Sequence, residues 1–227
     1  MAKIVITGAS RGIGFQLTKL AIEAGHEVLA LSRNTKPLDV LADSNLNVLA
    51  FDLETPTHCD AVVNFVRTHW ENQLDVLIHN AGAITLKPFQ EIDISAWKQI
   101  YQTNVFGVVT LTQHLLQFMN KEGHVVMISS MGGVQGSAKF AGLTAYSSSK
   151  GALITLTEVL AEEFKNKGPA FNALALGAVQ TEMLEEAFPG YKAPIKAQEI
   201  AGYILQFALQ GNKLFNGKII PVASSTP

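Results

Sequence analysis

Short apolar runs alternate with longer helix-like stretches along the whole chain, and this alternation constrains the fold more than any other feature. The short runs predict strands at Lys3–Thr7, Glu27–Ser32, Asn47–Asp52, Val76–His79, His124–Ser129, Ala170–Leu176 and Lys218–Val222. The longer stretches predict helices at Gly12–Ala24, Thr57–Trp70, Ser95–Met119, Ala145–Phe164 and Ala197–Leu209. Regular strand–helix alternation predicts right-handed crossovers and an α/β fold built on a doubly wound parallel sheet.

Several of the predicted strands are apolar throughout, as in residues 76–78 and 125–128. Continuous apolar strands are typical of a parallel sheet that is covered by helices on both faces. In such sheets, ligands bind beyond the carboxyl ends of the strands, where the strand order reverses. The residues that follow each strand are therefore the candidates for a functional site.

Composition excludes several classes of protein. No linker, charge block or low-complexity segment divides the 227 residues, so we expect a single domain over residues 1–227. The formal net charge of −2 provides no positive field for nucleic acid. No apolar run reaches the roughly 20 residues that span a bilayer, and the first residues do not resemble a signal peptide. We therefore expect a cytoplasmic protein with no membrane or nucleic-acid partner.

The single Cys59 excludes an intramolecular disulfide and a thiolate metal cluster.

A glycine-rich turn connects the first predicted strand to the first predicted helix. Gly8 permits a tight turn, Gly12 allows the backbone to approach a pyrophosphate, and Gly14 allows close packing of helix and strand. The start of the helix would then offer free N–H groups to phosphates. A simple glycine-rich turn is the alternative, but the strand–turn–helix context favours dinucleotide binding. The predicted phosphate-binding residues are Gly8, Ser10, Arg11, Gly12, Ile13 and Gly14.

The end of the second predicted strand indicates which dinucleotide is bound. A carboxylate at this position would bind the ribose 2′-hydroxyl of NAD, but the chain continues as Ser32-Arg33. The planar fork of Arg33 matches a 2′-phosphate, and Arg11 in the glycine-rich turn could add a second positive charge. Two solvated arginines are the alternative. The pattern predicts NADP as the cofactor, with NADPH preferred over NADH.

The spacing Thr-Gly-x-x-x-Gly-x-Gly in residues 7–14 resembles that of the classical short-chain dehydrogenases/reductases. Further family motifs follow in the same order along the chain. They are Asp52-Leu53, Asn80-Ala81-Gly82, Asn104, Ser129-Ser130, Tyr146 with Lys150, and Gly177 to Thr181. The resemblance covers nearly the whole chain and implies a Rossmann-type fold with hydride transfer between NADP(H) and a carbonyl or alcohol.

The resemblance also assigns expected roles. It implies a catalytic set of Asn104, Ser130, Tyr146 and Lys150, in which Ser130 binds the substrate oxygen and Asn104 anchors a water next to Lys150. It implies further cofactor contacts from Ser32, Arg33, Asp52, Leu53, Asn80, Ala81, Gly82, Tyr146, Lys150, Gly177, Val179 and Thr181. Relatives commonly form homodimers or homotetramers through the helices that correspond to Ser95–Met119 and Ala145–Phe164.

The expected chemistry depends on Tyr146 and Lys150. Their i, i+4 spacing places them on one face of a helix. A neighbouring ammonium and an oxidised nicotinamide would favour the phenolate, so we expect a lowered pKa for Tyr146. The tyrosine would then exchange a proton with the substrate oxygen near neutral pH.

The chain departs from the family pattern at several positions. His79 replaces the usual Asn, which we interpret as a structural substitution, and Leu176 replaces the usual Pro. The segment after Thr181 is short, and the usual C-terminal Asp-Gly-Gly is missing. His114 and His124 lack the spacing of metal ligands, so no metal is expected. The pairs Glu162-Glu163 and Glu185-Glu186 indicate solvated helix faces.

Three loops, residues 83–88, 131–143 and 182–194, are expected to form the substrate pocket. Their apolar lining favours small apolar or aromatic aldehydes and ketones. The expected lining residues are Met131, Val134, Phe140, Leu143, Met183, Leu184, Phe188 and Tyr191. One alternative is a non-catalytic, NADP(H)-binding regulator or redox sensor. A second alternative is an epimerase or dehydratase of the related extended fold. That class has a substantial C-terminal domain, and the roughly fifty residues after Thr181 are too few to form one.

Overall fold

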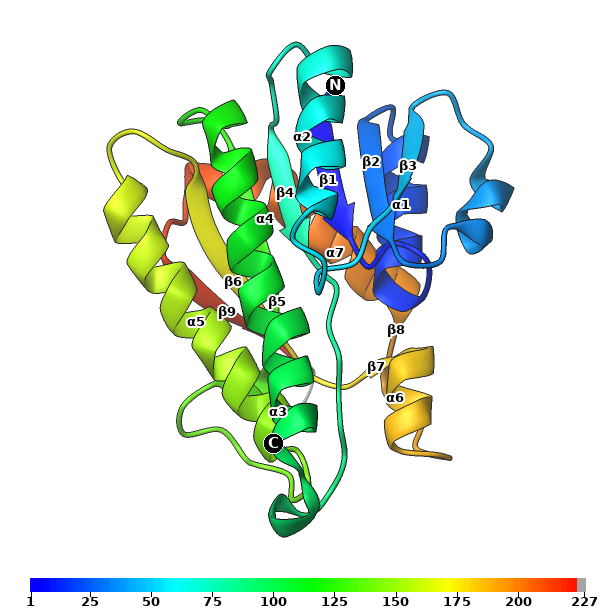
Figure 1. Ribbon diagram of the computed structural model, residues 1–227, viewed down its shortest axis with the longest axis vertical. Coiled ribbons are helices and arrows are strands. Elements are labelled where there is room, and N and C mark those ends of the chain that lie inside the picture. Colours follow the sequence, from blue (N-terminus) through cyan, green and yellow to red (C-terminus); the bar gives the residue numbers. More distant parts are fainter. Residues whose placement is uncertain (224–227) are drawn as a thin grey trace.

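A single seven-stranded parallel sheet forms the centre of the protein, in a computed structural model that describes residues 1–223. The strand order is β3-β2-β1-β4-β5-β6-β9, so the order reverses between β1 and β4 (Figure 1). The strands are β1 (Lys3–Thr7), β2 (Glu27–Ser32), β3 (Leu46–Ala50), β4 (Val76–His79), β5 (His124–Ser130), β6 (Ala170–Leu176) and β9 (Lys218–Val222). The predicted doubly wound α/β fold is confirmed.

Helices cover both faces of the sheet. In Figure 1, α2 (His58–His69), α4 (Gly107–Leu115) and α5 (Thr144–Phe164) lie in front of the sheet, and α1 (Gly12–Glu23) and α7 (Ala197–Gln210) lie behind it. Alternate side chains of one strand enter the two cores. Val5 packs in the core under α2, α4 and α5, whereas Ile4 and Ile6 pack in the core under α1 and α7. This burial on both faces explains why the strands are apolar throughout.

Smaller elements surround the carboxyl ends of the strands. The segment after β6 forms β7 (Val179–Gln180), the short helix α6 (Glu182–Ala187) and β8 (Ile195–Lys196), which pairs with β7. The hydroxyl of Thr181 caps α6 by accepting the N–H of Leu184 at 3.2 Å. In Figure 1, α6 projects beyond the lower end of the sheet. Sequence analysis did not predict these three short elements.

Two predicted elements differ from the observed bounds by more than one residue. The strand expected at Asn47–Asp52 ends at Ala50, because Asp52 belongs to a turn in which its carboxylate accepts the N–H of Glu54. The single helix expected at Ser95–Met119 is instead α3 (Ile94–Tyr101), a π-helical turn (Gln102–Phe106), α4 and a 3₁₀ turn (Leu116–Phe118). Further 3₁₀ turns lie at Lys36–Leu41, Phe89–Glu91, Met131–Gly133 and Gly211–Lys213.

The outer strand β9 carries a proline near its end. The carbonyl of Val222 accepts the N–H of Gly177 at 2.9 Å, so Val222 faces the sheet and the preceding Pro221 has its nitrogen on the open side. Proline is tolerated in a sheet at such an outer position because no ladder bond is lost there.

Within residues 1–223, none of the helices has both the length and the apolar character needed to cross a membrane.

Candidate active site

A cleft of about 970 Å³ lies at the carboxyl ends of the strands. It brings together nearly all residues predicted to contact cofactor or substrate. The predicted residues on its walls are Gly8, Ser10, Arg11, Gly12, Ile13, Ser32, Arg33, Asp52, Leu53, Asn80, Ala81, Gly82, Ser130, Tyr146, Lys150, Gly177, Val179 and Thr181. The two predicted residues outside the lining are Gly14 and Asn104.

The glycine-rich turn and the loop after β4 are locked together. A Cβ atom on Gly14 would lie only 2.1 Å from the carbonyl oxygen of Gly8, and one on Gly8 would lie 2.8 Å from Cα of Ala81. The side-chain amide of Asn80 donates to the carbonyls of Thr7 at 3.0 Å and Gly8 at 3.2 Å. Only glycine fits at positions 8 and 14, so the close backbone approach expected from the sequence is present.

The start of α1 is suited to phosphates. Its N-cap residue, Arg11, has extended backbone and no side-chain cap hydrogen bond. The first N–H groups of α1 therefore keep their hydrogen-bonding capacity for an anion, and the helix dipole adds positive potential there. This uncapped helix end, opening onto the large cleft, fits the pyrophosphate of a dinucleotide.

The ends of β2 and β3 form the wall where the sequence predicts the adenosine ribose. The hydroxyl of Ser32 donates to that of Ser10 at 2.7 Å, which joins the end of β2 to the glycine-rich turn. Arg33 follows on this wall and is exposed to solvent. Asp52 is fixed by the bond from Glu54 N–H at 3.0 Å, and its own N–H donates to Nδ1 of His58 at 3.0 Å.

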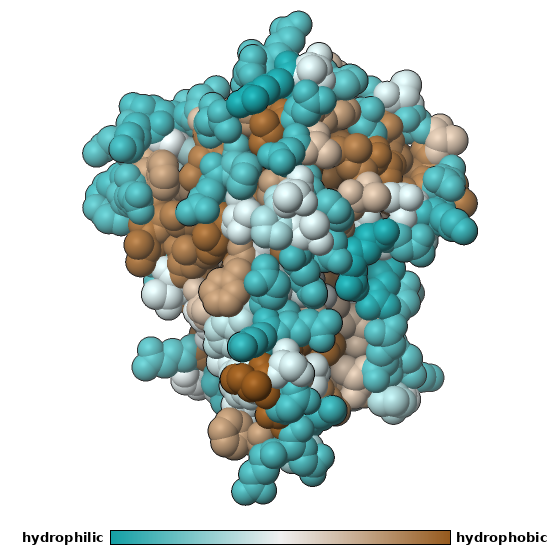
Figure 2. Space-filling view, viewed as in Figure 1, coloured by the Kyte–Doolittle hydropathy of each residue, from teal (hydrophilic) through white to brown (hydrophobic). Residues whose placement is uncertain are grey.

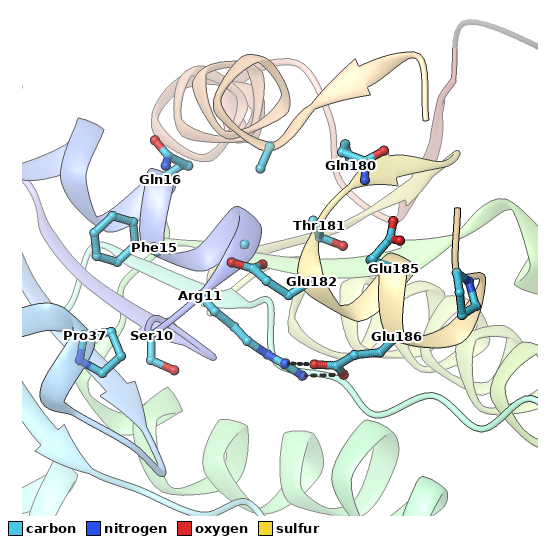
Figure 3. A pocket seen from close by; sticks show the side chains of 13 residues that line it. Ser10, Arg11, Phe15, Gln16, Pro37, Gln180, Thr181, Glu182, Glu185 and Glu186 are labelled. Carbon is cyan, nitrogen blue, oxygen red and sulfur yellow. Dashed lines mark hydrogen bonds and ion pairs between the residues drawn. The ribbon is translucent and has the colours of Figure 1, made fainter. Parts of the chain in front are cut away.

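Arg11 has a partner that the sequence did not indicate. Its Nη1 lies 2.5 Å from Oε1 of Glu186, and its Nη2 lies 3.4 Å from Oε2, so the guanidinium forks onto the carboxylate of α6 (Figure 3). Glu186 was expected to be only a solvated surface residue. It is solvent-exposed, but it connects α6 to the glycine-rich turn.

The predicted catalytic side chains meet at the inner end of the cleft. Tyr146 and Lys150 are one turn apart on α5, and the ammonium of Lys150 lies 5.8 Å from the centre of the tyrosine ring. Lys150 is buried and donates to the carbonyl of Ile128 at 2.8 Å. Ser129 donates its hydroxyl to the carbonyl of Lys150 at 2.9 Å, which fixes α5 against the end of β5, where Ser130 faces the cleft.

The pKa of Tyr146 moves in the direction opposite to the expected one. Burial raises the pKa of this phenol, and a hydrogen bond with Ser130 opposes the rise. Burial also lowers the pKa of Lys150 to about 8, so its ammonium loses a proton more readily than that of an exposed lysine. In the protein alone, Tyr146 is therefore a neutral phenol that can donate a proton.

Asn104 lies behind the cleft and positions its wall. It is fully buried in the π-helical turn, where its side-chain amide donates to the carbonyl of Ala83 and to the hydroxyl of Ser149, both at 2.9 Å. Its carbonyl oxygen accepts the N–H of Ala83 at 2.7 Å. Asn104 thus ties the loop after β4 to α5. Ser149, one residue before Lys150, was missed by sequence analysis, although its position three residues after Tyr146 places it on an inner face of α5.

His79 fills a structural position, as the sequence interpretation held. It is buried in β4, and its Nε2 lies 2.8 Å from the hydroxyl of Thr112 on α4. Burial lowers its pKa to about 3, so the ring is neutral. Cys59 is buried in α2, where burial raises the pKa of its thiol to about 11 and keeps it unreactive.

Apolar side chains form the outer end of the cleft. Seven of the eight residues expected there are present: Met131, Phe140, Leu143, Met183, Leu184, Phe188 and Tyr191. Val134 was wrongly expected, because it does not belong to the lining. Sequence analysis missed Gln99, Ile100 and Thr103, which reach the cleft from the region around α3. No sequence pattern marks these positions, since they face the cleft only through the packing of α3.

Comparison with known proteins agrees with this geometry. A sequence profile described as "short chain dehydrogenase" matches residues 2–192. The chain belongs to this family. As a short-chain dehydrogenase, the protein is an oxidoreductase. It is 30% identical to gluconate 5-dehydrogenase of Gluconobacter oxydans, covering 97% of this chain and 93% of the relative. It is 27% identical to a 3-oxoacyl-[acyl-carrier-protein] reductase of Salmonella typhimurium, covering 87% and 82% of the two chains.

Solved short-chain dehydrogenase structures share the whole architecture. One from Salmonella enterica serovar Typhi has a TM-score of 0.86 and 29% identity, covering 97% of this chain and 95% of its own. Another, from Shigella flexneri and complexed with NADP, has a TM-score of 0.85 and 27% identity, covering 97% and 96%. The family, the fold and the oxidoreductase class are thus confirmed.

Proposed function

We propose that this chain is a cytoplasmic, NADPH-preferring reductase of small apolar or aromatic aldehydes and ketones. The observation that carries the proposal is the placement of the neutral Tyr146 phenol with Ser130 on one cleft wall, one helical turn from Lys150, in a cleft that is also lined by apolar side chains. A neutral phenol is a proton donor, and carbonyl reduction requires a proton on oxygen.

In this mechanism, Ser130 and Tyr146 bind the carbonyl oxygen, and Tyr146 transfers its proton to that oxygen as the carbon is reduced. NADPH, when bound, supplies the hydride to the carbon. Lys150 holds the ribose hydroxyls and stabilises the phenolate that Tyr146 becomes. Asn104 fixes the wall next to Lys150 and anchors a water through which the proton is replaced. These roles follow the family resemblance, and the placement of the four side chains supports them.

The remaining cleft residues are proposed to hold the cofactor. Gly8, Gly12 and the start of α1 would bind the pyrophosphate, whereas Ser10, Ser32 and Arg33 would bind the adenosine ribose and its 2′-phosphate. Asp52 and Leu53 would bound the adenine, and the segments Asn80 to Gly82 and Gly177 to Thr181 would contact the nicotinamide half. The tight glycine packing and the uncapped α1 support this assignment.

A matched substrate panel tests the proposed function. With NADPH consumption as the readout, apolar and aromatic aldehydes and ketones should be reduced faster than sugars or charged keto acids, because the outer walls provide apolar contacts. Faster reduction of the sugars or keto acids at equal NADPH would contradict the proposed substrate class. No turnover across the panel, despite tight NADPH binding, would favour a non-catalytic regulator instead.

The cofactor preference is tested by replacing Arg33 with Asp. A charge-assisted hydrogen bond contributes about 1.5–3 kcal/mol, so loss of one bond to the 2′-phosphate should weaken NADPH binding about tenfold or more. The new carboxylate should improve binding of NADH. Fluorescence titration of both cofactors measures the change, and Arg67→Asp on α2 controls for the altered net charge. A wild-type protein that binds NADH at least as tightly as NADPH would contradict the assignment.

We further propose a homodimer or homotetramer that is built through α4 and α5. Figure 2 shows apolar areas on the face that these helices cover. Phe106, just before α4, is 53% exposed and Val159 on α5 is 56% exposed, while Leu156 and Leu160 are only partly buried. Light scattering should show an oligomer for the wild type and a monomer for Val159→Glu. Val40→Glu, at a site that is 76% exposed and distant from these helices in the sequence, should leave the oligomer intact. A monomeric wild type would contradict the proposal.

A further inference from the structure

A second hollow, of about 860 Å³, lies next to the candidate cofactor cleft, between the start of α1 and α6 (Figure 3). The two spaces are adjacent, because both are lined by Ser10, Arg11, Gly12, Pro37, Thr181 and Glu182. The α6 side of this hollow is acidic, with carboxylates from Glu182, Glu185 and Glu186. Arg11 belongs to the lining of both spaces, so it borders these carboxylates in the hollow and shares the lining of the cleft with Arg33.

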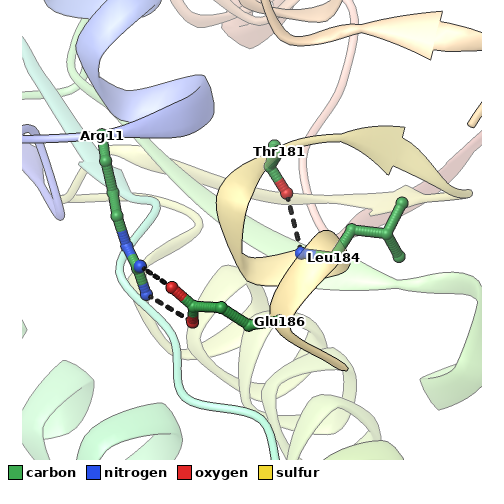
Figure 4. A network of polar contacts seen from close by, with 4 residues as sticks. All are labelled: Arg11, Thr181, Leu184 and Glu186. Atoms are coloured by element: carbon green, nitrogen blue, oxygen red, sulfur yellow. Dashed lines mark hydrogen bonds and ion pairs between the residues drawn. The ribbon is translucent and has the colours of Figure 1, made fainter. Parts of the chain in front are cut away.

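The charge of Arg11 is engaged by α6. Figure 4 shows its guanidinium facing the carboxylate of Glu186, with both terminal nitrogens directed at the two oxygens. Glu185, the preceding residue, makes a different contact, because its Oε1 accepts the N–H of Gly190 at 2.9 Å. Glu182 approaches the turn itself, and its Oε2 lies 3.3 Å from where a Cβ of Gly12 would be. Of these three carboxylates, Glu186 is the one for which an ion pair with Arg11 is observed.

A 2′-phosphate and the Glu186 carboxylate would compete for the same cation. Both terminal nitrogens of Arg11 are directed at Glu186, so a phosphate would have to displace or share this carboxylate, and it would also be repelled by it. A ribose without the phosphate places no second anion there, so the ion pair can persist when NADH binds. The competition therefore acts on one cofactor and not on the other.

We propose that Glu186 is a specificity-determining residue that restrains the preference for NADPH by holding Arg11 away from the 2′-phosphate. The inference rests on the proposed NADPH preference, with Arg33 at the 2′-phosphate and with Arg11 as the second positive charge that the sequence predicts there. The side chains of Arg11 and Glu186 are 49% and 61% exposed, so solvent screens the pair and the restraint is modest. Removal of the carboxylate should therefore change affinity by a few-fold rather than by orders of magnitude.

The test measures dissociation constants for NADPH, NADH, 2′,5′-ADP and 5′-ADP in wild type and variants. Glu186→Gln should bind NADPH and 2′,5′-ADP about three- to tenfold more tightly, with NADH and 5′-ADP changed less than twofold. Glu185→Gln is the matched control, because it removes the same charge from the same helix and keeps an oxygen for Gly190. It should change each of the four constants less than twofold.

A double variant separates competition from a general charge effect. If Glu186 acts through Arg11, then Glu186→Gln should no longer tighten NADPH binding in an Arg11→Gln background. Equal tightening of NADPH and NADH by Glu186→Gln, no tightening of NADPH, or tightening that persists without Arg11 would overturn the inference. Equal wild-type affinity for NADPH and NADH would instead overturn the proposed cofactor preference. The effect of Glu186 would still be measured in that case, as the ratio of the NADPH dissociation constants of the variant and the wild type.

Discussion

Tyr146→Phe is expected to lower kcat by about 10²–10⁴ while NADPH binding stays close to that of the wild type. The substitution removes only the hydroxyl, so the ring still packs against α5 and the cleft keeps its shape. The other group that we place at that atom, the Ser130 hydroxyl, is an aliphatic alcohol and a much weaker acid than a phenol, so it is a poor substitute for Tyr146 as the proton donor. Steady-state kinetics with an aromatic aldehyde and fluorescence titration of NADPH measure the two effects separately.

Two other variants sharpen this experiment. Tyr101→Phe removes a hydroxyl from α3, outside the catalytic group, and should retain normal turnover. Lys150→Met should reduce kcat and also raise the Kd for NADPH, because Lys150 is proposed to hold the ribose as well as to assist Tyr146. Near-normal turnover by Tyr146→Phe would show that another group supplies the proton.

Acidification from pH 7 to pH 5 is expected to lower the free energy of unfolding by about 4 kcal/mol through two buried histidines. Burial lowers the pKa of His79 to about 3 and that of His124 to about 4, whereas both have a pKa near 6.5 in the unfolded chain. The unfolded chain therefore binds protons that the folded protein resists. The stabilisation is fully present above about pH 6.5 and is lost as the pH falls toward the folded values, about 2 kcal/mol per histidine by pH 5.

The hydrogen bonds explain why both rings resist protonation. His124 contacts the carbonyl of Ala208 through Nδ1, and its Nε2 faces the side-chain amide donor of Asn172 at 2.9 Å, so a second ring proton would oppose that donor. Nδ1 of His79 is buried without a hydrogen-bond partner among the described residues. Urea unfolding at the two pH values measures the loss. His79→Gln and His124→Gln should each reduce it, and His69→Gln at an exposed site should not. An unchanged pH dependence in both buried variants would contradict the argument.

The sheet could be predicted from the sequence because helices cover both of its faces, which favours strands that are apolar on both sides. Val76–His79 and Ala170–Leu176 are buried on both faces and mostly apolar, and these bounds agree with β4 and β6. The strand β3 is less buried, and its end was misplaced by two residues. The helix break at Asn104 could not be predicted, because helical periodicity continues through Gln102–Phe106 while the cause is a set of bonds to Ala83 and Ser149, distant in sequence.

The site was predictable where backbone geometry demands one residue type. Gly8 and Gly14 are fixed by close approach of main chain to main chain, which a motif records directly. The direction of the Tyr146 pKa was not predictable, because burial raises it and helical spacing shows that Lys150 is nearby but not how deeply the phenol is buried. The partner of Arg11 was missed for a similar reason. α6 has only six residues, and 175 positions in the sequence separate Arg11 from Glu186.

The position of Pro221 in β9 limits how copies of this protein can associate. An exposed outer strand normally offers N–H and carbonyl groups to a strand from another molecule, which is a route to fibrils and to sheets shared between subunits. On the open side of β9, Pro221 has no N–H to offer, and its ring obstructs the approach of another backbone. A continuous intermolecular sheet is thus interrupted at that residue. At this edge, contacts between subunits are left to side chains, whose shape and polarity can discriminate between partners in a way that backbone pairing cannot.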